Sequence, residues 1–164
     1  MSLQPVRERR ILAVDDDPAV LDLIVTRLTL ADYEVYYARD GREALARVRE
    51  LRPAGLILDI NMPELDGFGV LTALGQTGEL ARLPTMVLTA RNQQGDVQRA
   101  VKMGARDFLA KPFNDKQLVM RVARLLRRPG APAAPSPSAS SAAAPDSAPQ
   151  PLNQEATKPH DFLI

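Results

Sequence analysis

Residues 11–17 read ILAVDDD, a short run of apolar residues that ends in three aspartates. Three further stretches have the same design, namely 55–59 (GLILD), 85–89 (TMVLT) and 107–111 (DFLAK). The apolar residues follow one another without alternation, which is typical of strands covered by helices on both faces. In open parallel sheets of this kind, ligands bind beyond the carboxyl ends of the strands. We therefore expect acidic, hydroxyl and ammonium groups to meet at one edge of a sheet, where they suit a divalent metal and a phosphoryl group.

Helix-like segments alternate with these strands along the first 128 residues. Asp17 before Pro18 is typical of a helix N-cap followed by proline. Repeated strand–helix units predict right-handed crossovers and a parallel sheet. We predict strands at 10–15, 33–38, 55–59, 84–89 and 106–110, and helices at 18–30, 41–51, 67–75, 94–102 and 114–127.

Size and composition exclude several kinds of protein. The 164 residues favour one domain, and 21 Lys+Arg against 20 Asp+Glu give no sign of an obligatory nucleic-acid or membrane partner. The chain has no cysteine for disulfides or thiolate metal sites, and its single histidine, His160, excludes a multi-histidine zinc site. Residues 1–10 lack the features of a signal peptide, and no apolar stretch approaches the roughly 18–20 residues of a membrane span. We expect a soluble, cytoplasmic protein.

The composition changes near residue 129. The last 36 residues contain 8 Pro, 9 Ala and 5 Ser, and such a segment buries too little apolar surface to offset its ordering entropy. We predict a folded domain at 9–128 and a disordered Pro/Ala/Ser-rich tail or interdomain linker at 129–164. The apolar ending Phe162-Leu163-Ile164 fits either a docking peptide or the start of a further domain.

Four motifs at the strand ends resemble those of a response-regulator receiver domain. In the order of that family they are VDDDP at 14–18, DINMPELDG at 59–67, LTA at 88–90 and KPF at 111–113. The resemblance implies an α/β, flavodoxin-like (CheY-like) fold: a doubly wound parallel sheet of five strands in the order 2-1-3-4-5, with five helices. It also implies a phosphorylation-controlled switch of a two-component phosphorelay. Such a domain catalyses its own aspartyl phosphorylation and dephosphorylation and is not an enzyme for an external substrate.

The same resemblance gives a role to each strand-end side chain. Asp59 is the expected phospho-acceptor, because a carboxylate can attack phosphorus in line. Lys111, before a cis Pro112, pairs with Asp59 and then with the phosphoryl group, for which a flexible point charge is suited. Thr89 offers its hydroxyl to a phosphoryl oxygen. Phosphorylation draws Thr89 toward the site and lets the switch residue Phe108 turn inward.

The acidic residues are expected to bind Mg²⁺, which prefers hard oxygen ligands. The resemblance implies direct ligation by Asp16, Asp59 and the backbone carbonyl of Asn61, with Asp15 acting mainly through water. Asp17 is left out of this set because it is the predicted helix cap.

Three other positions are expected to support the site. Asn61 and Arg91 lie two residues after the acceptor and after Thr89, at family positions that influence the lifetime of the phosphoryl group. Gly67 is expected to support the loop after Asp59 by adopting a positive φ.

The expected partner is a histidine kinase or a histidine phosphotransfer protein. The resemblance also allows a homodimer through 94–102, 106–110 and 114–127, although Arg106 departs from the acidic residue common in receivers that dimerise in this way. We expect no membrane binding and no direct nucleic-acid binding by this segment.

The alternative functions differ either in the segment that comes after the receiver or in the class of protein. The chain fits a stand-alone switch or a receiver fragment of a longer transcriptional or enzymatic response regulator. A constitutive protein-interaction module is disfavoured by the intact acidic residues, Thr89 and Lys111. An aspartyl-nucleophile phosphatase is disfavoured because Asp59 is at the end of the third strand rather than the first.

Overall fold

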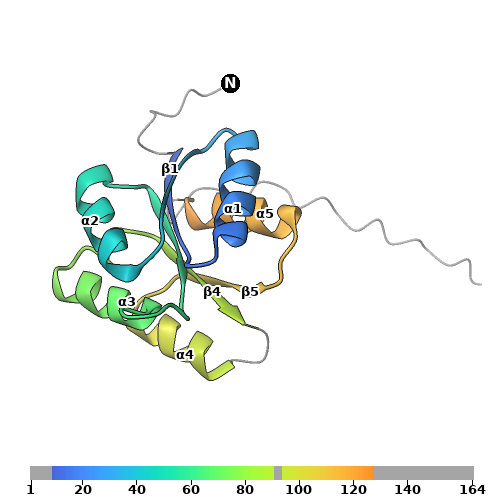
Figure 1. Ribbon diagram of the computed structural model, residues 1–164. Coiled ribbons are helices and arrows are strands. Elements are labelled where there is room, and N and C mark those ends of the chain that lie inside the picture. Colours follow the sequence, from blue (N-terminus) through green and yellow to red (C-terminus); the bar gives the residue numbers. More distant parts are fainter. Residues whose placement is uncertain (1–8, 91–93, 128–164) are drawn as a thin grey trace, which may run out of the picture. The chain divides into compact units, whose positions relative to one another are not determined.

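Five short parallel strands form the centre of the domain in the computed structural model (Figure 1). The structure describes residues 9–90 and 94–127. The sheet order β2-β1-β3-β4-β5 confirms the order implied by the resemblance, and the direction of winding reverses between β1 and β3. The strands are β1 (Arg10–Val14), β2 (Glu34–Ala38), β3 (Gly55–Asp59), β4 (Thr85–Ala90) and β5 (Asp107–Lys111).

Helices cover both faces of this sheet, as Figure 1 shows. One face carries α1 (Pro18–Leu30) and α5 (Asp115–Leu125), which contact each other. The other carries α2 (Gly41–Leu51), α3 (Gly67–Gln76) and α4 (Gln94–Met103), with α3 between its two neighbours. Within the described residues, no helix is long and apolar enough to cross a membrane.

Strands β1 to β4 contribute side chains alternately to two separate cores, whereas the edge strand β5 contributes Leu109 to the core under α1 and α5. In β3, Leu56 and Leu58 pack with residues of α2 and α3, whereas Ile57 packs with residues of α1 and α5. All residues of β3 are buried. Burial on both faces is the reason that the strand sequences are continuously apolar.

The predicted elements begin and end within two residues of the observed ones. The last helix differs most, since it was expected at 114–127 and spans Asp115–Leu125. Its N-cap is Asn114, whose side chain accepts the Gln117 N–H at 2.9 Å. Asp17 caps α1 as predicted. The expected boundary at residue 129 and the tail lie outside the described residues, so they stay predictions.

Candidate functional site

The carboxyl ends of four strands bring the predicted site residues to one edge of the sheet. The register between β3 and β4 places Asp59 beside Leu88, the residue before Thr89. Lys111, the last residue of β5, lies beside Ala90 of β4. Asp15 and Asp16 directly follow β1, which pairs with β3.

Three aspartates form a compact acidic cluster at this edge. Asp15, Asp16 and Asp59 each have a carboxylate oxygen within 4.8 Å of those of the other two. Asp15 is fully buried and Asp59 is 3% exposed, whereas Asp16 is exposed to solvent. Asp15 is oriented by the backbone N–H of Asp17, which donates to its Oδ1 at 2.9 Å. The cluster is therefore built on two buried carboxylates and reaches the surface at the third.

Lys111 is the cation paired with these carboxylates. Its Nζ lies 2.5 Å from Oδ2 of Asp15 and 3.3 Å from Oδ1 of Asp59. The resemblance pointed to pairing with Asp59, and the ammonium in fact lies nearer to Asp15. The Lys111–Pro112 peptide bond is cis, as expected. Burial lowers the pKa of Lys111, but the hydrogen bond to Asp15 and the charges of Asp59 and Asp15 outweigh it and raise the pKa above its ordinary value.

Asp59, the candidate phospho-acceptor, has a pKa above the ordinary value of an aspartate. Burial raises the pKa of Asp59 to about 6, and the negative charge of Asp15 adds to the rise. Lys111 and a hydrogen bond from the backbone of Asn61 act in the opposite direction. In the described part of the chain, three carboxylates and one ammonium meet at this site, so its negative charge exceeds its positive charge. A further cation would therefore be attracted to it.

The two switch candidates lie along the β4–β5 pair. Thr89 is 2% exposed near the end of β4 and is paired with Ala110. Phe108, two residues earlier on β5, is 39% exposed. The structure therefore brings Thr89 to the edge with the acidic cluster and leaves Phe108 at the side of the sheet. Arg91 lies outside the described residues.

The expectation that Gly67 adopts a positive φ is wrong. The positive φ in this loop belongs to Glu64, at 64°, and Gly67 has no positive φ. A Cβ at Gly67 would instead lie 2.4 Å from the carbonyl oxygen of Asp59 and 2.8 Å from Cα of Ile60. Glycine is required because the start of α3 packs directly on the backbone at the end of β3.

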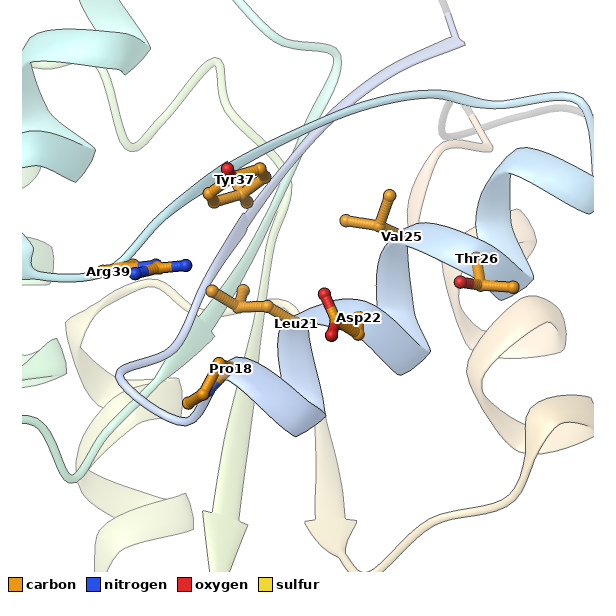
Figure 2. Close-up of a pocket in the computed structure, with 7 residues that line it drawn as sticks. All are labelled: Pro18, Leu21, Asp22, Val25, Thr26, Tyr37 and Arg39. Carbon is orange, nitrogen blue, oxygen red and sulfur yellow. The ribbon is translucent and has the colours of Figure 1, made fainter.

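A hollow that the sequence did not reveal lies between α1 and the end of β2. Its volume is about 310 Å³, and none of the clustered aspartates lines it. Figure 2 shows Tyr37 and Arg39 opposite the side of α1 that carries Leu21 and Val25. The lining residues come from segments far apart in the sequence, so no local motif marks them. Apart from one acidic and one basic side chain, Asp22 and Arg39, the lining residues are uncharged, and they do not form a catalytic set.

Comparison with known proteins agrees with this geometry. The family model of the response regulator receiver domain matches residues 11–123. The transcriptional regulatory protein PrrA of Mycobacterium leprae is 46% identical over 126 residues, which is 77% of this chain and 53% of PrrA. The response regulator MprA of the same species is 45% identical over 119 residues, 73% of this chain and 51% of MprA. The chain spans about half the length of these curated relatives.

Solved structures show the same fold. The chemotaxis response regulator CheY4 of Vibrio cholerae matches with a TM-score of 0.67 and 34% identity, covering 71% of this chain and 97% of CheY4. The receiver domain of the Francisella response regulator 1452 matches with a TM-score of 0.67 and 29% identity, covering 72% and 96%. Because the family match covers more than half of the chain and the sheet order agrees with it, the chain belongs to the receiver domains of two-component response regulators.

Proposed function

We propose that Asp59 accepts a phosphoryl group from the phosphohistidine of a histidine kinase or phosphotransfer protein, and that this modification operates the receiver as a switch. The observation that carries the proposal is the setting of Asp59. It is a buried carboxylate with Asp15 and Asp16 beside it and the ammonium of Lys111 at 3.3 Å. The domain acts on itself and turns over no metabolite.

The acidic cluster fits Mg²⁺. Three carboxylates lie close together with less positive charge than negative around them, and Mg²⁺ prefers such oxygen ligands. Asp16, Asp59 and the carbonyl of Asn61 would hold the ion directly, and Asp15 would act mainly through water. Bound there, the ion would neutralise charge on the phosphoryl oxygens.

The residues of the chain supply positioning and electrostatics for the transfer. A carboxylate oxygen of Asp59 attacks phosphorus in line, the bond from phosphorus to the histidine nitrogen breaks, and that nitrogen keeps the electron pair. Asp59 must be ionised to attack, and a pKa of about 6 leaves it mostly ionised at pH 7. The ammonium of Lys111 then turns from the carboxylates to a phosphoryl oxygen, and the hydroxyl of Thr89 donates to another.

The output of the switch is a shift between two conformations of the surface made by β4, α4, β5 and α5. Thr89 moves toward the phosphoryl group, and the ring of Phe108 turns inward behind it. Asn61 and Arg91 influence how long the phosphoryl group lasts.

The relatives suggest how the signal is used. PrrA is named a transcriptional regulatory protein, and the chain matches about half of it. We extend the proposal to a regulator of transcription that dimerises through α4, β5 and α5 on phosphorylation.

Arg106, the residue that departs from the pattern of receivers that dimerise in this way, makes a contact within its own chain. Its Nη2 donates to the carbonyl of Ala81 at 3.3 Å. Sedimentation with and without a phosphoryl mimic tests dimerisation, and the coding frame after Ile164 tests for a DNA-binding domain.

Labelling tests the acceptor assignment. Incubated with Mg²⁺ and acetyl phosphate, the purified chain is expected to gain one phosphate in intact mass spectrometry. Asp59→Asn is expected to gain none. Asp17→Asn, which keeps a capping side chain outside the cluster, is expected to label like the wild type. Labelling that persists in Asp59→Asn would refute the assignment.

A further inference from the structure

Phe108 and Arg121 meet at the open edge of the sheet, although they start from opposite faces. Val87 lies beside Phe108 in the parallel β4–β5 pair, and Thr89 lies beside Ala110. Paired and alternate residues share a face of a sheet, so Phe108 belongs to the same face as Val87 and Thr89. Val87 packs in the core under α2, α3 and α4, which identifies that face.

Arg121 belongs to α5, on the other face of the sheet. Its guanidinium carbon nevertheless lies 5.4 Å from the centre of the Phe108 ring. A ring packed under α4 beside the fully buried Val87 would lie on the far side of the sheet from α5. The ring therefore leans outward over the edge strand, in agreement with its exposure of 39%.

The guanidinium is held in this position by a buried carboxylate. Asp107 is 5% exposed, and its Oδ1 lies 2.6 Å from Nη1 of Arg121. Its Oδ2 lies 2.7 Å from Nη2 of Arg124, and the backbone N–H of Phe108 also donates to Oδ1 at 2.8 Å. Arg121 is thus a fixed cation over the ring, whereas Arg124 binds the same carboxylate without a described contact to the ring.

We propose that Arg121 is a positioning residue that holds Phe108 outward and thereby opposes activation of the switch. The inference rests on the proposed function, because it concerns the ring movement that accompanies phosphorylation. A cation over a partly exposed ring favours that ring position about two- to fivefold. Loss of the contact raises the population of the inward ring position by that factor. Because phosphorylation selects the inward state, the rate of phosphorylation is expected to rise by the same factor.

Two matched variants separate the ring contact from the ion pair. Arg121→Gln removes the cation over the ring, and Arg124→Gln removes only the other partner of Asp107. With acetyl phosphate and Mg²⁺, Arg121→Gln is expected to be phosphorylated about two to five times faster than wild type, and Arg124→Gln at the wild-type rate. In a Phe108→Leu background, Arg121→Gln is expected to have no further effect.

A second measurement needs no phosphorylation. Ring-labelled phenylalanine, assigned through Phe108→Leu, reports the environment of Phe108 by NMR. Arg121→Gln is expected to move this signal toward the position it takes in the wild type with bound beryllofluoride, and Arg124→Gln is not. Arg121→Lys, which keeps a cation near Asp107, serves if the glutamine variant does not fold, and a partial shift is expected.

The outcomes distinguish the two proposals. If the wild type gains no phosphate, the proposed function fails while the NMR signal still tests the ring contact. Equal rates for Arg121→Gln and Arg124→Gln, or an effect that persists in Phe108→Leu, would overturn the inference. An unchanged ring signal in Arg121→Gln would overturn it as well.

Discussion

Asp59 is a buried carboxylate whose neighbours carry charges of both signs, and its acidity makes stability depend on pH. Its pKa is raised from 3.8 to about 6, so the folded chain binds this proton more tightly than the unfolded chain does. The resulting stabilisation is complete below about pH 4 and is lost as the pH rises through about 6. In the absence of a cation, the ionised carboxylate therefore makes the fold less stable at neutral pH.

Replacing the carboxyl by an amide tests this account. In EDTA, Asp59→Asn is expected to exceed the wild type by about 2–3 kcal/mol in free energy of unfolding at about pH 7.5, with almost no difference at about pH 4. Lys111 keeps Asp15 as a partner in the variant. Urea unfolding at the two pH values measures the difference, and Asp17→Asn is the control. A difference that does not change with pH would show that the charge is not the cause.

Gly67 offers a second test at the residue scale. In Gly67→Ala the new Cβ meets backbone atoms of Asp59 and Ile60, which cannot move without displacing the end of β3. We expect a loss of about 2–4 kcal/mol of stability and slower labelling of Asp59. Gly75→Ala, in the same helix with nothing within 4 Å of its Cβ, is expected to gain about 0.5–1 kcal/mol. Chemical unfolding compares the two, and equal effects would contradict the close-approach explanation.

At the scale of elements, the helices differ in how they are attached to the sheet. Among the described residues of α4, Ala100 is the buried one, whereas α5 buries Leu118, Val122 and Leu125 and has a capping box at its start. A second contact of α4 is the guanidinium of Arg99, which lies 4.0 Å from the ring centre of Phe68 on α3. Weak attachment suits an element that moves when the domain switches.

Hydrogen exchange tests this difference. The amides of α4 are expected to exchange faster than those of α3 and α5, because few buried contacts resist local opening. Arg99→Ala is expected to increase exchange in α4 about two- to fivefold by removing the contact with Phe68. Lys102→Ala on the same helix is the matched control. Protection of α4 equal to that of α5 would contradict the expectation.

At the scale of the whole molecule, the acidic cluster joins β1 and β3, and Lys111 joins β5 to it. The unfolded chain does not hold these groups together, so a cation that binds here stabilises the folded state. At a Mg²⁺ concentration of about ten times Kd, the expected gain is about 1.4 kcal/mol, or about 5 °C in Tm. Asp16→Asn is expected to lose most of this gain and Asp17→Asn to keep it in thermal unfolding. A rise of equal size in both variants would place the cation elsewhere.

Much of the fold and the site could be predicted from local sequence. Continuous apolar runs marked the strands, Asp17 marked the start of α1, and the polar residue at each strand end marked one edge of the sheet. Predictions of helix ends were less accurate, as at Asn114, where the side chain caps the helix rather than extending it. The hollow beside α1 was missed because Tyr37 and Arg39 meet α1 only in the folded chain.

The sequence by itself determined the strand pattern, the motifs and the acidic, hydroxyl and ammonium groups available at the sheet edge, because apolar periodicity and strand ends are local properties. The tertiary structure decided how these groups meet. It placed Lys111 nearer to Asp15 than to Asp59, required glycine at 67 through close packing, and set Arg121 over Phe108. These outcomes depend on distances between residues far apart in the chain, and such distances exist only after the sheet and its helices have packed together.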